Sequence, residues 1–125
     1  VKEVREHLEQ LLARGIINHQ SHHDHHLLTG TEEEWEAANI RDYRAINQRT
    51  VKDSYVLPRI DEIFDSMQGA KYFTTLDMKA AYHQIEVEKE HKPRTAFTVG
   101  PYGLYQYSRM PFGLMNSPAT YERIV

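Results

Sequence analysis

The chain has 125 residues, of which 40% are hydrophobic and 26% charged, and this balance predicts one globular domain rather than a disordered tail. It contains no cysteine, which excludes disulfides, thiolate zinc sites and cysteine nucleophiles. Because no apolar run is long enough to cross a membrane and no signal-peptide pattern opens the sequence, we expect an intracellular protein without a membrane partner.

The formal net charge of −3 is unevenly placed. Residues 1–50 carry six Lys or Arg against nine Asp or Glu, whereas residues 51–125 carry nine of each. Nucleic-acid binders usually present a basic surface, so composition alone does not favour a nucleic-acid partner. The sequence opens and stops inside helical patterns, which predicts an excerpt from a longer protein.

The first predicted element is a helix over residues 2–14. Val1, Val4, Leu8, Leu11 and Leu12 share one face, and Gly15 is a suitable residue to follow the helix. Residues 16–17, both Ile, continue as an extended apolar pair.

A histidine-rich tract follows. Five histidines and one aspartate fall within residues 19–26, and the histidines are His19, His22, His23, His25 and His26. Imidazole and carboxylate groups at this density can bind zinc, copper or nickel. A solvated polar loop is the simpler interpretation, because nothing in the tract promises the rigid surroundings that a metal site needs.

Residues 27–70 are predicted to hold three short elements. Leu27 and Leu28 suggest a short strand. Residues 31–38 suggest a short helix, with Thr31 and Glu34 forming a capping box. A helix is predicted from Pro58 in its first turn to Gly69 after its end, because residues 60, 63, 64 and 67 are apolar at helical spacing.

The next stretch carries the strongest chemical signal. Residues 72–75 are aromatic or β-branched, so we expect a strand over residues 72–77 that ends on Asp77. Small residues, Ala80 and Ala81, then precede Tyr82. A strand-end carboxylate can hold Mg²⁺, and small residues let backbone N–H groups approach a phosphate. An Asp at such a place is more often a turn residue or a helix cap.

The remaining residues predict mixed α and β structure. Residues 85–90 suggest an alternating edge and a charged turn. Strands over residues 94–99 and 104–109, joined by the turn at 100–103, predict a hairpin. Residues 110–116 form a loop, and Ser117 caps a final helix with Pro118 in its first turn.

Six ordered blocks in this sequence resemble the reverse transcriptase of gypsy-type long-terminal-repeat retrotransposons. They are residues 42–47, 57–60, 69–77, 82–85, 92–98 and 110–120, so the resemblance runs from residue 42 to residue 125, and residues 11–17 also match the family's opening helix. The resemblance implies an α+β fold, with residues 1–70 as fingers and residues 71–125 as part of the palm of a right-hand polymerase. It implies an RNA-directed DNA polymerase within a Gag-Pol polyprotein, acting on an RNA or DNA template-primer and dNTPs with Mg²⁺ or Mn²⁺.

Roles for the Asp77 region come only from this resemblance. Asp77 matches the first catalytic, metal-binding aspartate, and Met78 matches a position whose backbone carbonyl binds metal. Ala80 and Ala81 match the turn whose N–H groups meet the triphosphate. Tyr82 matches the aromatic residue that lies under the deoxyribose and excludes a 2′-hydroxyl. In a two-metal displacement, such residues position and neutralise the reacting phosphates.

The resemblance also implies roles in the later loop. Phe112 and Gly113 match residues that lie against the incoming nucleotide. Asn116, Ser117 and Pro118 match the start of a helix near the template strand.

Two departures from the family bear on activity. The family's later Tyr-x-Asp-Asp motif is missing, and no Asp-Asp pair occurs in these 125 residues. In the fingers, Trp35 is followed by Glu36 where the family has arginine, and residues 32–34 are glutamates where the family has cations. We therefore expect an eroded segment over residues 18–41 and a chain that is inactive by itself.

Three hypotheses follow. The leading one is a fragment of a retrotransposon RNA-directed DNA polymerase. The second is a non-catalytic relic that keeps the fold and a weak nucleic-acid surface. The third is a metal-binding module built on the histidine tract.

Overall fold

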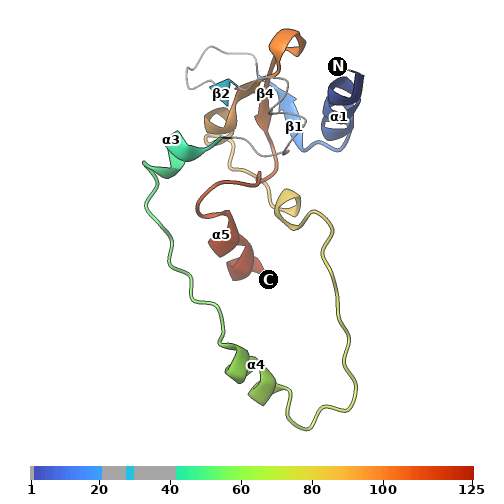
Figure 1. Ribbon diagram of the computed structural model, residues 1–125, viewed down its shortest axis with the longest axis vertical. Coiled ribbons are helices and arrows are strands. Elements are labelled where there is room, and N and C mark those ends of the chain that lie inside the picture. The colour runs from blue at the N-terminus through green and yellow to red at the C-terminus, as the bar shows by residue number, and fades with distance from the viewer. Residues whose placement is uncertain (1, 21–27, 30–41) are drawn as a thin grey trace.

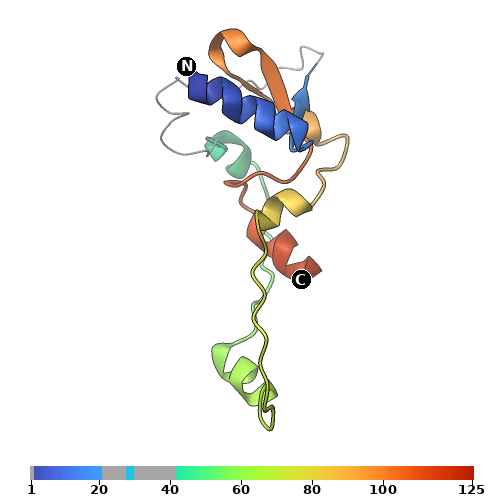
Figure 2. The same cartoon turned by 90° about the vertical axis from the view of Figure 1, so that its right-hand side faces the viewer.

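The computed structural model describes residues 2–20, 28–29 and 42–125. These residues form a body, built around a small sheet, and an arm, which we define as residues 51–80. Figure 1 shows the arm leaving the body on one side, reaching the helix α4 (Ile60–Ser66) at its far end and returning on the other side. Seen from the side in Figure 2, the arm projects away from the body as a narrow extension.

The body contains a four-stranded sheet in the order β1-β4-β3-β2. β1 (Ile17–His19) pairs antiparallel with β4 (Leu104–Tyr107), and β4 pairs antiparallel with β3 (Phe97–Thr98). β2 (Leu28–Thr29) pairs parallel with β3. Strands far apart in the sequence therefore lie side by side, as with Ile17 opposite Tyr107. The α+β class expected from the sequence is confirmed at this level.

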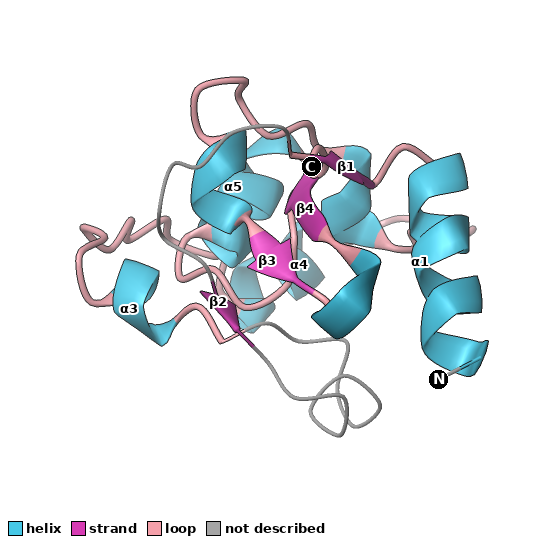
Figure 3. Ribbon diagram, turned by 90° about the horizontal axis from the view of Figure 1, so that it is seen from above, coloured by secondary structure: helices cyan, strands magenta, loops and turns pink. Residues whose placement is uncertain are grey.

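One hydrophobic cluster holds α1 (Lys2–Ala13) against this sheet. Val4 and Leu8 are its buried helical residues, as the apolar spacing predicts. The strands contribute Ile17, Phe97 and alternate residues of β4, because side chains two apart on a strand share a face. Phe97 is fully buried, with its ring centroid 5.8 Å from that of Tyr105. Figure 3 shows α1 and α3 (Arg44–Asn47) on opposite sides of the sheet.

Short 3₁₀ helices connect these strands. η2 (Lys92–Thr95) leads into β3, and η3 (Gly100–Tyr102) closes the turn between β3 and β4. The Thr95 hydroxyl donates to the Lys92 carbonyl at 2.6 Å and accepts the Tyr107 N–H at 2.9 Å, so it links η2 to β4. The predicted hairpin is confirmed, but its strands are shorter than residues 94–99 and 104–109, because η2 takes the start of the first.

The arm differs from its prediction. α4 (Ile60–Ser66) forms as expected, with Arg59 at its N-cap, so Pro58 lies before the helix rather than in its first turn. The predicted strand over residues 72–77 is wrong: residues 70–78 have no regular structure. Strand propensity depends on a neighbouring strand to pair with, and none lies beside this segment among the described residues. Every arm residue except Asp53 is exposed.

The final helix, α5 (Ser117–Ile124), lies below the sheet between the two ends of the arm (Figure 1). Its N-cap is Asn116, so Ser117 is its first residue rather than its cap, and the Ser117 hydroxyl lies 3.2 Å from the Pro111 carbonyl. The predicted short helix at residues 31–38 lies outside the described residues. None of the described helices is long and apolar enough to cross a membrane.

Candidate nucleotide and metal site

The turn after Asp77 leads the chain from the arm back into the body. Ala80 has left-handed backbone angles, φ 50° and ψ 51°, which are uncommon for a residue with a side chain. η1 (Ala81–Gln84) follows, and the His83 N–H donates to the Ala80 carbonyl at 2.9 Å. By helix geometry the N–H groups of Ala81 and Tyr82 have no acceptor within η1, so they remain available to an anion.

An aromatic cluster forms where this turn meets the later loop. The Tyr82 ring centroid lies 5.0 Å from that of Phe112 and 5.7 Å from that of Tyr121. His83 packs edge-on against Phe112 at 5.3 Å and stacks on Tyr107 at 6.5 Å. Burial in this cluster lowers the pKa of the His83 imidazole from its ordinary value of 6.5. The cluster joins η1, the 110–116 loop, β4 and α5.

One asparagine connects α3 to the loop that carries Phe112. The Asn47 amide donates to the Gly113 carbonyl at 2.9 Å, and its oxygen accepts the Met115 N–H at 2.8 Å. Gly113 itself has φ 93°, a value that favours glycine. Two backbone groups of the loop are thus fixed by one side chain that lies more than sixty residues earlier in the sequence.

The N-terminal end of the arm is held against α5. The Asn116 amide donates to the Val51 carbonyl at 2.9 Å, and its oxygen accepts the Asp53 N–H at 3.0 Å. Arg123 forms an ion pair with Asp53 at 2.7 Å and lies 5.1 Å above the Tyr55 ring. Residues 51–55 are therefore held by contacts with both ends of α5, from Asn116 at its start and from Arg123 near its end.

The C-terminal end of the arm also contacts α5. The Tyr121 hydroxyl lies 2.9 Å from the Met78 sulfur, and η1 packs on α5. Asp77, which precedes Met78, is exposed. The predicted metal ligand thus lies next to an anchored residue, at the point where the arm rejoins the body.

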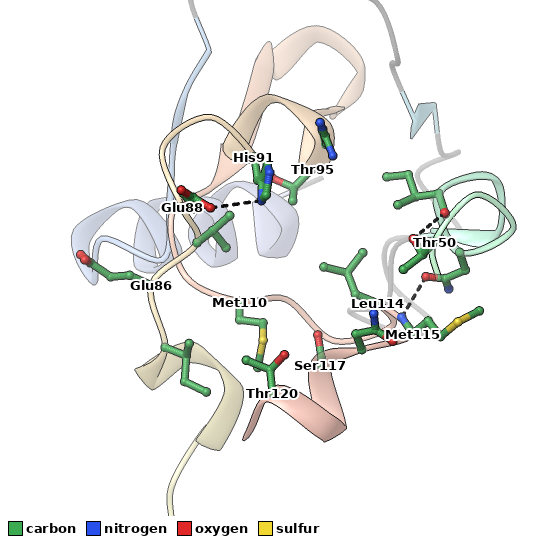
Figure 4. A pocket seen from close by; sticks show the side chains of 16 residues that line it. Thr50, Glu86, Glu88, His91, Thr95, Met110, Leu114, Met115, Ser117 and Thr120 are labelled. Carbon is green, nitrogen blue, oxygen red and sulfur yellow. Dashed lines mark hydrogen bonds and ion pairs between the residues drawn. The ribbon is translucent and has the colours of Figure 1, made fainter. Parts of the chain in front are cut away.

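A pocket of about 270 Å³ lies beside the loop (Figure 4). Met110, Ser117 and Thr120 lie along one side of it, and Leu114 and Met115 along another. His91 and Glu88, 3.6 Å apart, lie at a third side. The loop residues between Met110 and Ser117 therefore line a pocket as well as contributing Phe112 to the aromatic cluster.

The described residues do not assemble a complete metal site. No three His, Cys, Asp or Glu side chains of the described ranges come together. Asp77 and the Met78 carbonyl are oxygen ligands of the kind that Mg²⁺ prefers, but a single carboxylate leaves most of an octahedron to be filled by other groups. A second carboxylate, Asp42, is engaged elsewhere: its hydrogen bonds with the Arg44 side chain and backbone lower its pKa to about 2.

Among the described residues, only one histidine of the tract is placed. His19 lies in β1, where its ring centroid is 4.9 Å from that of Tyr105. His22, His23, His25 and His26 lie outside the described residues. The metal-module hypothesis therefore gains no support from the described part of the chain.

The predicted site residues thus fall into two groups. Tyr82 and Phe112 are brought into contact by the fold, with Ala81 beside them and Gly113 fixed by Asn47. Asp77 stands on the exposed arm. Sequence reasoning missed the bridging role of Asn47, although this residue lies inside the first block of the family resemblance.

Comparison with known proteins decides the family. The sequence model of the family described as reverse transcriptase (RNA-dependent DNA polymerase) matches residues 37–125, which is more than half of the chain. The chain belongs to this reverse transcriptase family. The resemblance expected from the sequence is thereby confirmed.

The chain is similar to parts of longer proteins that are named as polyproteins or as a polymerase homolog. It is 45% identical over 84 residues to the retrovirus-related Pol polyprotein from transposon 297 of Drosophila melanogaster, covering 67% of this chain and 8% of that protein. It is 32% identical over 130 residues to the enzymatic polyprotein of Soybean chlorotic mottle virus, covering 100% of this chain and 19% of that protein. An RNA-directed DNA polymerase homolog of Oenothera berteroana is 41% identical over 80 residues, covering 64% of this chain and 56% of that protein. The chain therefore spans only a part of each of these relatives.

Proposed function

We propose that this reverse transcriptase segment is the nucleotide-binding part of an RNA-directed DNA polymerase within a longer Pol polyprotein. The observation that carries the proposal is the contact of Tyr82 with Phe112, at 5.0 Å, beside the N–H groups of Ala81 and Tyr82. The rings of Tyr82 and Phe112, next to free N–H donors, suit a dNTP, whose sugar packs on a ring while its phosphates accept hydrogen bonds.

The roles of the individual residues are part of this proposal. Tyr82 and Phe112 form the surface on which the sugar and base lie, and Asn47 positions that surface by fixing Gly113 and Met115. The N–H groups of Ala81 and Tyr82 bind the triphosphate. Asn116, Ser117 and Pro118 open α5 near the template strand.

Asp77 and the Met78 carbonyl would hold Mg²⁺ or Mn²⁺. When bound, the metal neutralises charge on the triphosphate and activates the primer hydroxyl. The described residues supply one carboxylate for this purpose, so the remaining ligands come from water, the triphosphate and other parts of the polyprotein. The same proposal includes an intracellular location, in a cytoplasmic particle, in the nucleus or in both. It also assigns the fingers to residues 1–70 and the palm to residues 71–125.

A chimera tests the proposal without the segment at residues 18–41. Residues 42–125 would replace the corresponding residues of the transposon 297 polyprotein, to which the chain is 45% identical over 84 residues. We expect Mg²⁺-dependent primer extension by the chimera and none by the 125-residue chain alone, because the chain lacks an Asp-Asp pair. The measurement is incorporation of labelled dNTP on a primed template.

Two substitutions make the test specific. Asp77→Asn in the chimera is expected to reduce incorporation to background, because it removes a metal-binding carboxylate. Asp61→Asn is the matched control, since Asp61 is also an exposed arm carboxylate and should leave incorporation unchanged. Equal activity of both variants would contradict the role of Asp77.

A further inference from the structure

The turn over residues 78–82, which links the arm to the body, has a backbone conformation that side chains support. Ala80 has a positive φ, which a residue with a Cβ adopts only at an energetic cost. The Gln84 side-chain amide reaches back and donates to the Lys79 carbonyl at 3.0 Å. This contact braces the middle of the turn, whereas its two ends are held from a different element.

One side chain of α5, Tyr121, contacts both ends of this turn. Its hydroxyl lies 2.9 Å from the sulfur of Met78, the first residue of the turn. Its ring packs edge-on against the ring of Tyr82, the last residue, with the centroids 5.7 Å apart. Met78 follows Asp77 in the sequence, and the Tyr82 ring also contacts Phe112. Tyr121 therefore connects the neighbour of the candidate metal ligand to the candidate nucleotide surface.

The helix that carries Tyr121 is itself held at both ends. Ser117, at its start, is buried, and Arg123, near its end, forms an ion pair with Asp53 at 2.7 Å. Tyr121 is half-buried between these two points. A tyrosine has only two side-chain torsions, so holding its ring and its hydroxyl in fixed directions costs little conformational entropy.

We propose that Tyr121 is a positioning residue of the candidate polymerase site, and that its hydroxyl and its ring have separate roles. The hydroxyl holds Met78, and thereby sets where the Asp77 carboxylate stands relative to the turn. The ring holds Tyr82 against Phe112. This inference rests on the proposed function, since it concerns how that same site is held together.

Ordinary packing makes a different prediction for the same residue. If Tyr121 only filled space, Tyr121→Phe would have almost no effect, because phenylalanine keeps the ring and its contact with Tyr82. The proposal assigns an effect to the hydroxyl alone, and it locates that effect at Met78.

Methyl NMR of the 125-residue chain tests this contact without metal or catalysis. The chain has four methionines, so carbon-13 labelling of the methionine methyl groups gives four signals, and Met78→Leu identifies the signal of Met78. We expect Tyr121→Phe to shift the Met78 signal and to leave the signal of Met67, at the end of α4, unchanged.

Tyr105→Phe is the matched control for this measurement. It also removes a hydrogen-bonded hydroxyl, which donates to the Tyr102 carbonyl at 2.8 Å, but it does so in the sheet. The Met78 signal should therefore stay where it is in this variant. A Met78 signal that is the same in Tyr121→Phe as in the original chain overturns the proposal.

The chimera that carries residues 42–125 separates the two roles kinetically. Tyr121→Phe should raise the Mg²⁺ concentration for half-maximal incorporation about threefold, as expected for one weak hydrogen bond to sulfur, and should leave KM for dNTP unchanged. Tyr121→Leu should raise both constants, with KM up about fivefold, because it also removes the aromatic contact with Tyr82. A loss of folded protein alone would lower kcat and would move neither constant.

Met78→Leu completes a double-mutant cycle in the chimera. It removes the sulfur acceptor and keeps the backbone carbonyl, so by itself it should also raise the Mg²⁺ constant about threefold. Added to Tyr121→Phe it should change little more, because the two substitutions remove one interaction. Effects of the two substitutions that simply multiply would contradict the pairing.

This inference and the proposed function fail in different ways. A chimera that is inactive, or that Asp77→Asn leaves active, contradicts the proposed function, and the methyl signals then decide by themselves whether Tyr121 holds the turn. A chimera that is active and sensitive to Asp77→Asn, but whose Mg²⁺ constant is the same in Tyr121→Phe, overturns the positioning role alone.

Discussion

The body and the arm of this reverse transcriptase segment bury their apolar residues to very different extents. The body encloses Phe97, Ile17 and Val99 almost completely. The arm carries Val51, Val56, Phe64, Tyr72 and Leu76 in the open. Both regions are apolar in sequence, so the difference lies in whether a neighbouring element is present to pack against.

The two regions also divide the candidate site. Tyr82, Phe112 and Asn47 belong to the body, where rings and amides hold one another in place. Asp77 belongs to the arm. The aromatic part of the candidate site is therefore built within the described residues, whereas Asp77 stands on the exposed arm.

The largest expected effect contrasts one phenylalanine from each region. Phe97→Ala should lower the free energy of unfolding by about 3–5 kcal/mol, because it empties a fully buried position between Tyr105 and Tyr107. Phe73→Ala, at a residue that is 66% exposed, should change it by less than about 0.5 kcal/mol. Urea denaturation of both variants measures the contrast, and a large loss from Phe73→Ala would show that the arm is packed in solution.

An intermediate effect is expected at the link between α3 and the loop. Asn47→Ala removes two hydrogen bonds, to Gly113 and Met115, and should cost about 1 kcal/mol. The loss is local, so Asn47→Ala should speed the deuterium exchange of the Met115 amide and leave that of the β4 amides unchanged. Gln48→Ala, at the exposed neighbouring residue, is the control. Unchanged exchange at Met115 would mean that the loop is held by its other contacts.

The smallest effect is a pH dependence at the junction of the two regions. Burial lowers the pKa of His83 below 6.5, so the folded state binds fewer protons at this group than the unfolded state does. Stability should be greatest above pH 6.5 and should fall as the pH drops through 6.5 towards the lowered value. We expect the melting temperature to fall from about pH 7.5 to pH 5.5, and to fall by less than it does in the Asn47→Ala variant.

His83→Phe should flatten this pH dependence, because it keeps an aromatic ring beside Phe112 and removes the titrating group. His7→Gln, on α1, is the comparison variant and should retain it. A pH profile that is the same in His83→Phe and in the original chain would assign the effect to another residue.

Sequence reasoning succeeded where a segment with a recognisable residue pattern packs against, or pairs with, another element of the body. The apolar spacing of Val4 and Leu8 predicted α1, and the β-branched and aromatic residues around residues 100–103 predicted the hairpin. The same residue types predicted a strand at residues 72–77, where none forms. Propensity is a property of the segment, whereas a strand also requires a second strand to bond with.

The sequence predicted which residues belong to the candidate site, but not how they contact one another. The family resemblance named Tyr82 and Phe112, but their contact depends on the whole path of the chain between them. The hydrogen bonds of Asn47 and Asn116 could not be predicted, because a side-chain amide has no periodic pattern that points to its acceptor more than sixty residues away.

The anchoring of the arm on α5 has a consequence for the order of folding. Asn116 and Arg123 hold Val51 and Asp53, so closing this junction brings together segments 63 to 70 residues apart. Contacts at such separations close slowly, because the entropy of the intervening chain must be lost first. The pairing of β1 with β4 in the sheet spans a longer separation still, from Ile17 to Tyr107. The junction and the sheet are therefore both expected to form after the local helices such as α1, whose contacts lie within a few residues.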